Sequence, residues 1–175
     1  MNHFTSRTLA LSGVLIALNV VLSRFVSIPV GNSLRISVAQ IPVILAGIWF
    51  GPVIGGLTGM IGDLIGTAIN GYAPNPFITF SATLVGVIPA LLAPYIRKNA
   101  ENSFNRFLRF LPVIALTMLI TSQGLTTLGL SVMYGMPFAA TFLTRLPQSL
   151  FLCVINSFLC ALIYDRVRAE RFGLA

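Results

Sequence analysis

The chain carries one acidic residue deep inside an apolar stretch. Asp63 is the only charged residue between Ile36 and Ile96, and glycines occur on both sides of it, at positions 55, 56, 59, 62, 66 and 71. A carboxylate in hydrocarbon costs several kcal/mol unless it has a partner, so an intramembrane acid is by default a functional residue. Asp63 could accept hydrogen bonds from a solute that offers paired N–H donors, or it could form an ion pair with a basic side chain. Both interpretations stay open.

Three arginines lie at the ends of apolar stretches, apart from the other basic residues. Arg24, Arg35 and Arg145 all fall at the predicted outer ends of membrane spans. Each one alone could extend its guanidinium to the lipid head groups. The three together would form a site for an anionic solute, because guanidinium groups make bidentate hydrogen bonds to carboxylate or phosphate.

The segment from Pro76 to Thr83 combines aromatic and hydroxyl side chains. Phe77 and Phe80 could stack on a planar ring, and Ser81 could donate or accept a hydrogen bond. Packing in the core explains the two phenylalanines equally well. Three further polar residues in apolar stretches form either interhelical hydrogen bonds or solute contacts: Gln123, Gln148 and Asn156.

The elements that must position these residues are transmembrane helices. Of the 175 residues, 56% are hydrophobic and 9% are charged, whereas a soluble domain has roughly 25% charged residues. We predict an all-α integral membrane protein, with one membrane domain over residues 1–175 built as a six-transmembrane-helix bundle. The first span is expected to be retained rather than cleaved as a signal peptide. The predicted spans are residues 7–28, 36–50, 53–70, 78–97, 110–132 and 145–165.

With six spans, most basic residues fall on one side of the membrane. The positive-inside rule makes that side cytoplasmic, so we predict a multi-pass protein of the plasma membrane with both termini in the cytoplasm. The net charge of +7 then needs no nucleic acid to explain it. The residues on that side are Arg7, Arg97, Lys98, Arg106, Arg109, Arg166, Arg168 and Arg171.

The side-chain inventory argues against several kinds of site. His3 is the only histidine, and Cys153 and Cys160 lie seven residues apart on one predicted helix face. We therefore expect no disulfide, no metal and no cofactor. The sequence has no GxxxxGK[ST] loop, so the chain cannot hydrolyse ATP through that device, and no nucleophile–base pair indicates an enzyme. Uphill transport would need an ion gradient or another protein.

Small residues predict two helix-packing surfaces. In the first span Gly13 and Ala17 lie four residues apart among large apolar side chains, which permits the close approach of another helix. That helix could belong to the same chain or to a partner subunit. In the third span the glycines at positions 55, 59, 62 and 66 have a similar spacing, and we expect most of them to serve helix packing.

Four features occur within one stretch, residues 34–66: LRI at 34–36, Pro42, FGP at 50–52 and DLIG at 63–66. This stretch resembles the substrate-binding S components of energy-coupling factor (ECF) vitamin transporters, in particular the folate-specific branch. PFITFSATLVG at 76–86 is a second match, and Arg145-Leu146 is a weaker third. FGP alone marks the wider family, whereas its combination with DLIG and FSA points to folate.

The resemblance implies a six-helix protein with cytoplasmic termini that binds a vitamin at the outer face. It also implies association with a transmembrane coupling protein and two cytoplasmic ATPases. The first helix of the family carries an Ala-x-x-x-Ala-type motif that docks on the coupling protein, and Gly13 and Ala17 occupy the corresponding positions. For folate, we expect Asp63 to meet the pterin, the phenylalanines to stack on the ring, and the three arginines to meet the carboxylates of the tail.

Other functions remain open at this point. The chain could be an S component for another vitamin, such as pantothenate, a thiamine precursor or a pyridoxine-like ring. It could also be a stand-alone carrier coupled to protons or sodium. An integral membrane enzyme is the least supported, because the sequence offers no nucleophile–base pair.

Overall fold

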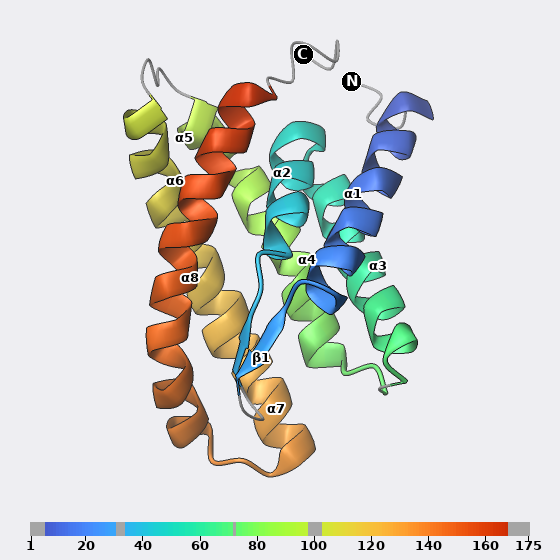
Figure 1. Cartoon of the computed structure of the whole chain (residues 1–175), viewed down its shortest axis with the longest axis vertical. Coiled ribbons are helices and arrows are strands. Elements are labelled where there is room, and N and C mark those ends of the chain that lie inside the picture. Colours follow the sequence, from blue (N-terminus) through green and yellow to red (C-terminus); the bar gives the residue numbers. More distant parts are fainter. Residues whose placement is uncertain (1–5, 31–33, 72, 98–102, 168–175) are drawn as a thin grey trace.

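The computed structural model describes residues 6–30, 34–71, 73–97 and 103–167, and over these residues the chain is helical apart from one short hairpin. The helices run side by side along the long axis of the molecule, and α1 begins at the same end of the bundle at which α8 finishes (Figure 1). In chain order the elements are α1 (Ser6–Arg24), β1 (Ile28–Val30), β2 (Leu34–Ile36), α2 (Gln40–Phe50), α3 (Pro52–Ile69), α4 (Pro76–Leu91), α5 (Ala93–Arg97), α6 (Ser103–Met118), the π-helix η1 (Leu119–Thr126), α7 (Thr127–Tyr134) and α8 (Phe138–Arg166).

Four helical stretches are long and apolar enough to cross a membrane. They are α1, α3, α8 and the run from Phe104 to Met133, in which α6, η1 and α7 follow one another without a break. The apolar helices α2 and α4 are shorter. The prediction of a helical membrane protein is confirmed at this level, and the count of six spans stays a prediction.

The short helix α2 occupies the centre of one half of the bundle. Nine of its 11 residues are buried, and its Ile44 packs in one core cluster with Phe110 and Ile114 of α6. At 1.5 Å per residue, α2 is about 16 Å long, roughly half of the ~30 Å hydrocarbon thickness. The hairpin of β1 and β2 lies in the other half (Figure 1). The half beyond the start of α2 is therefore not filled by a continuous helix.

Glycines allow α3 to pack closely on α2 and α4. A Cβ atom at Gly55 would lie within 3 Å of the backbones of Gly47 and Gly86, and one at Gly59 would collide with the carbonyl of Ala82. Since no larger residue fits without moving a backbone, these glycines serve helix contact. The packing role predicted for the third span is confirmed at these two positions.

The hairpin corrects the predicted ends of the first two spans. α1 ends at Arg24 rather than at residue 28, and α2 begins at Gln40 rather than at residue 36. Pro29 fixes its own φ and has no amide hydrogen to donate, which weakens a helix at this position. The branched side chains of Ile28 and Val30 on either side favour an extended backbone. The two strands pair in antiparallel orientation.

The last two long helices begin earlier than predicted. α6 starts at Ser103 rather than at residue 110, and α8 starts at Phe138 rather than at residue 145. In α6, apolar Phe104 and Phe107 lie three residues apart among polar ones, an amphipathic pattern that mean hydropathy does not detect. Arg145 consequently lies about two turns inside α8 instead of at its end.

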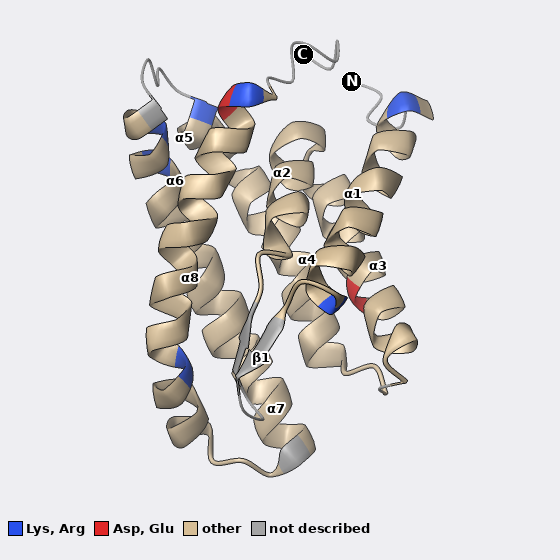
Figure 2. Ribbon diagram, viewed as in Figure 1, with Lys and Arg blue, Asp and Glu red and all other residues tan. Residues whose placement is uncertain are grey.

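Basic residues gather at one end of the bundle, which we call the basic end. Figure 2 shows them at the upper ends of α1, α5, α6 and α8. The described members are Arg7, Arg97, Arg106, Arg109 and Arg166. The predicted grouping is confirmed for these five, while Lys98, Arg168 and Arg171 lie outside the described residues. Arg24, Asp63 and Arg145 are placed farther from that end.

Candidate functional site

A cavity of about 250 Å³ lies in the half of the bundle beyond the start of α2. Residues of α1, α2, α3, α4, η1 and α8 surround it, together with Met118 at the end of α6 and the segment that leads into α2. Its charged and amide-bearing lining residues are Asn19, Arg24, Gln40, Asp63, Arg145 and Gln148. The cavity therefore lies where α2 begins, because α2 spans only half of the bundle while neighbouring helices continue past its first residue (Figure 1).

Asp63 is held at the cavity by two partners. The hydroxyl of Thr79 in the first turn of α4 donates a hydrogen bond to its Oδ2, with an O···O distance of 2.8 Å. Arg24, the last residue of α1, has a favourable charge–charge interaction with the same carboxylate. Figure 2 shows this end of α1 beside the acidic segment of α3. The acid is thus both a cavity residue and the partner of an arginine.

Two glycines of α3 make room for the polar side chains of α1. A Cβ atom at Gly66 would lie 2.5 Å from Nη2 of Arg24, and one at Gly62 would collide with the side-chain oxygen of Asn19. Asn19 in turn donates through Nδ2 to the carbonyl oxygen of Ala39, at 2.6 Å, just before α2 begins. These glycines therefore position α1 side chains against α3 at the cavity.

Arg145 enters the cavity from α8, and its Nη2 lies 3.3 Å from Oγ of Ser122 in η1. Among the described lining residues, Asp63 is the only acid. Asp165 lies at the basic end and pairs with Arg106 at 2.8 Å, so it does not balance Arg145. Two arginines and one aspartate leave the cavity with a formal charge of +1, which favours an anionic ligand.

The π-helical turn η1 forms one wall of the cavity. Ser81 of α4 donates to the carbonyl oxygen of Thr121 at 3.0 Å, and its Oγ lies 3.0 Å from Oγ1 of Thr126. Ser81, Ser122 and Thr126 all line the cavity. π-helical turns are rare and occur frequently at functional sites. Ser81 thus joins α4 to η1 at the place where both face the cavity.

Comparison with known proteins gives the family. Residues 3–168 match the family described as "ECF-type riboflavin transporter, S component". The chain belongs to this family. The match covers almost the whole sequence, and it confirms the resemblance to ECF S components that the 34–66 stretch predicted.

Two sequence relatives and one solved structure narrow the similarity. This S component is 27% identical over 146 residues to the folate transporter FolT of Clostridium novyi (strain NT), which covers 82% of this chain and 79% of the relative. It is 33% identical over 98 residues to a UPF0397 protein of Exiguobacterium sp., covering 55% of this chain and 54% of that protein. A crystal structure of FolT bound with folic acid matches with a TM-score of 0.76 and 29% identity, over 94% of this chain and 96% of that one.

The structure brings four of the seven predicted ligand contacts to one cavity. Arg24, Asp63, Ser81 and Arg145 come from four different helices and all line it. Arg35 lies in β2, and its side chain is outside the described part of the structure. The structure thus shows that these four residues lie around one cavity, whereas the role of each residue stays a prediction.

Phe77 and Phe80 do not line the cavity. Their side chains are 41% and 56% exposed on the surface of α4. The cavity face of this helix carries Ile78, Ser81 and Val85, which recur every three or four residues. The two phenylalanines therefore lie on other faces, and their stacking on a ligand ring stays a prediction.

Gly13 and Ala17 face away from the bundle. Both are exposed, and a Cβ atom at Gly13 would meet nothing within 4 Å. No described helix packs into this groove, so internal packing, one of the two alternatives, is wrong within the described residues. A partner interface at these positions stays a prediction.

Neutral polar residues complete the cavity and were not predicted. Asn19 and Ser23 lie one turn apart in α1, and Ser37 and Gln40 flank the start of α2. The signal in the sequence was the spacing of Asn19 and Ser23, which places both on the helix face next to Arg24.

Gln123, Gln148 and Asn156, each predicted to form either an interhelical hydrogen bond or a solute contact, differ in their surroundings. Gln123 donates to Oγ of Ser149 at 2.6 Å, an interhelical hydrogen bond, whereas Gln148 lines the cavity. Asn156 is fully buried in α8. Both cysteines are free, and no three His, Cys, Asp or Glu side chains of the described residues gather as a metal site.

The lining suits binding better than catalysis. Apolar walls from Ile78, Val85, Met118 and Leu152 can enclose a ring. Amide and hydroxyl groups can meet its polar edges, and the excess positive charge can hold an anionic group. Membership of a transporter family agrees with this interpretation.

Proposed function

We propose that this S component binds folate in the cavity between α1, α3, α4, η1 and α8 and presents it for uptake. Support comes from the folate transporter FolT relative, from the folic acid-bound FolT structure, and from the net positive charge of the cavity. The observation that carries the proposal is the presence of one acid and two arginines in the lining of one cavity that also has apolar walls.

Each part of folate has a matching group. The pterin offers adjacent N–H donors, and Asp63 is the only described acid that can accept them in the cavity. The glutamate tail carries two carboxylates, for which Arg24, Arg145 and, from the hairpin, Arg35 are the candidates. At about 250 Å³ the cavity is smaller than the ~300–1,000 Å³ of pockets that enclose drug-sized ligands. We therefore expect the pterin ring to lie inside the cavity and the glutamate tail to lie at its opening.

In the proposed orientation the basic end is cytoplasmic and the cavity opens to the outside. Residues 1–175 then form one membrane domain of six spans in the plasma membrane, with both termini in the cytoplasm. Energy comes from two ATPases through a transmembrane coupling protein, which contacts the exposed groove of Gly13 and Ala17 on α1. The S component itself carries out no catalysis.

Riboflavin is the second candidate, because the matching family is described by that vitamin. Riboflavin carries no carboxylate and leaves one arginine of the cavity without a counterion. Titration calorimetry of the purified protein with folate, riboflavin, pantothenate, thiamine and pyridoxine separates the candidates. We expect tight binding of folate without nucleotide. Binding of another vitamin with no heat from folate would contradict the proposal.

A second measurement tests the dependence on ATPases. In proteoliposomes that contain this chain alone, an imposed proton or sodium gradient should give no folate accumulation. Accumulation under those conditions would support a stand-alone ion-coupled carrier instead.

A further inference from the structure

A second groove lies at the basic end, on the outer surface between α6 and α8. Its volume is about 450 Å³, within the range of small-molecule sites. α1, with its proposed coupling-protein surface, lies across the bundle from it (Figure 1). The groove is lined by Phe104, Phe107, Phe158 and Leu162, with Asp165 and Arg166 at its end.

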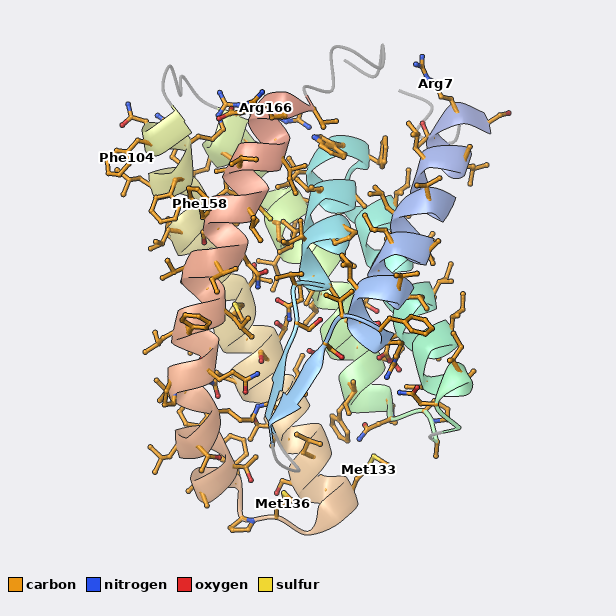
Figure 3. The ribbon with its side chains drawn as sticks, viewed as in Figure 1. Arg7, Phe104, Met133, Met136, Phe158 and Arg166 are labelled. Carbon is orange, nitrogen blue, oxygen red and sulfur yellow. The ribbon has the colours of Figure 1, made fainter. Side chains whose placement is uncertain are left out.

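The walls of this groove are apolar and exposed. The ring of Phe107 lies 6.4 Å from that of Phe104 on the same helix and 6.4 Å from that of Phe158 on α8. Phe104 is 69% exposed, Phe158 55% and Leu162 46%. Figure 3 shows Phe104 and Phe158 on this side of the molecule. Such a surface is costly in water but suits the acyl chain of a lipid.

Among the described residues, the end of the groove carries one positive charge more than it has negative charges. Arg106 forms an ion pair with Asp165 at 2.8 Å and also lies over the ring of Tyr164, 5.1 Å from its centroid. The negative charge of Asp165 is therefore already neutralised. Arg166, at the end of α8, is exposed and forms no hydrogen bond or ion pair with any described residue. Figure 3 shows it above the phenylalanines.

We propose that this groove binds an anionic phospholipid, with one acyl chain between the phenylalanines and the phosphate at Arg166. The charge of the groove favours an anionic head group, and its walls are too apolar for a soluble anion. Cation-rich pockets between transmembrane helices near the cytoplasmic surface are typical sites for such lipids. The proposal requires that the chain lies in a membrane, but it does not depend on which vitamin the cavity binds.

Native mass spectrometry of the detergent-solubilised protein tests the site. Phosphatidylglycerol and phosphatidylcholine with the same acyl chains are added at equal concentrations, and retained lipid is measured. We expect phosphatidylglycerol to be retained at least fivefold more strongly. Arg166→Gln should remove that preference, whereas the matched control Arg7→Gln should keep it. Arg7 lies at the same end of the molecule but on α1, far from the groove (Figure 3).

A variant that fills the groove, combined with a measurement of folate binding, distinguishes loss of the lipid site from a general defect. Leu162→Trp narrows the groove and should reduce the retention of both lipids while folate binding is unchanged. If Arg166→Gln and Arg7→Gln reduce the preference for phosphatidylglycerol equally, the lipid is attracted non-specifically to the basic end, and the proposal is overturned. Variants that keep their lipid but lose co-purification with a coupling complex would also overturn it, since the groove would then be a protein interface. If the wild-type protein retains phosphatidylglycerol as expected but binds no folate, the result contradicts the proposed function and leaves the lipid site standing.

Discussion

At the scale of single residues, Asp63 has two partners inside the protein and one proposed partner outside it. Replacing it with Asn keeps the size of the side chain but removes the charge and one acceptor. Hydrogen bonds to charged groups contribute about 1.5–3 kcal/mol, or roughly 10–100-fold in affinity. We expect Asp63→Asn to weaken the binding of folate by more than tenfold and the binding of unsubstituted pterin by a similar factor, as measured by calorimetry. Thr79→Val, which removes the 2.8 Å hydrogen bond but not the charge, should cost only a few-fold. Unchanged affinity in a folded Asp63→Asn protein would limit this acid to pairing with Arg24.

Arg145 tests the other end of the ligand. If its guanidinium meets a carboxylate of the tail, Arg145→Gln should weaken folate about 10–100-fold and leave pterin, which lacks the tail, unaffected. The ligand pair is then its own control, because a folding defect would weaken both. Titration calorimetry of the two ligands at one salt concentration measures the difference. A loss that is equal for folate and pterin would place Arg145 at the ring instead.

The charged residues of the site and Ser81 could be predicted from sequence, whereas most of the neutral polar residues could not. Asp63, Arg24 and Arg145 stand out because a charge in an apolar stretch has a high cost and needs a reason. Asn19 and Gln40 carry no such cost, and the spacing of Asn19 and Ser23 was the only feature that placed a neutral side chain on the helix face next to Arg24. Phe77 and Phe80 could not be assigned to a face, because almost every residue of α4 is apolar and a membrane helix lacks the polar side that reveals its orientation.

At the scale of elements, the glycines of α3 divide by what they face. The added Cβ at Gly66 would contact the flexible guanidinium of Arg24, whereas the one at Gly59 would contact the backbone of Ala82. Gly66→Ala should therefore preserve folding, helped by the higher helix propensity of Ala, but displace Arg24 and weaken folate about tenfold. Gly59→Ala should lower the unfolding free energy by about 1–3 kcal/mol. Thermal unfolding in detergent and calorimetry measure the two effects. Strong destabilisation by Gly66→Ala would show that Arg24 cannot move aside.

The hairpin and the π-helix η1 were not predicted from the sequence, because each is short and leaves no clear hydropathy pattern. Apolar length predicted the helices, but a strand of three residues has no measurable period, so the hairpin around Pro29 was interpreted as two helix ends. The π-helical turn from Leu119 to Thr126 is a difference in hydrogen-bond register and leaves no mark on hydropathy. The short second span was visible in the sequence. What could not be seen is that its shortness opens the cavity.

At the scale of the whole molecule, the two ends of the bundle differ in their side chains. The cavity lies beyond the start of α2, and the arginines of the basic end lie at the opposite end of the bundle (Figure 2). The exposed groove on α1 belongs to neither, since Gly13 and Ala17 are both exposed and a Cβ atom at Gly13 would meet nothing within 4 Å. Val14, between them, is 63% exposed, so the surface is apolar as well as shallow. A surface of small and apolar residues on one outer helix suits packing against a helix of another subunit.

This separation predicts that docking and ligand binding can be lost independently. Gly13→Leu and Ala17→Leu place larger side chains on the exposed side of α1, so folate affinity and thermal stability should stay near wild type. Co-purification with a tagged coupling complex from cells that express both should fall at least tenfold, because a leucine at either position prevents close helix approach. Ala140→Leu makes the same change on the exposed side of α8 and should leave co-purification intact. Loss of folate binding in the α1 variants would mean that α1 transmits the change to Arg24, at its other end. Unchanged co-purification would place the coupling surface on a different helix.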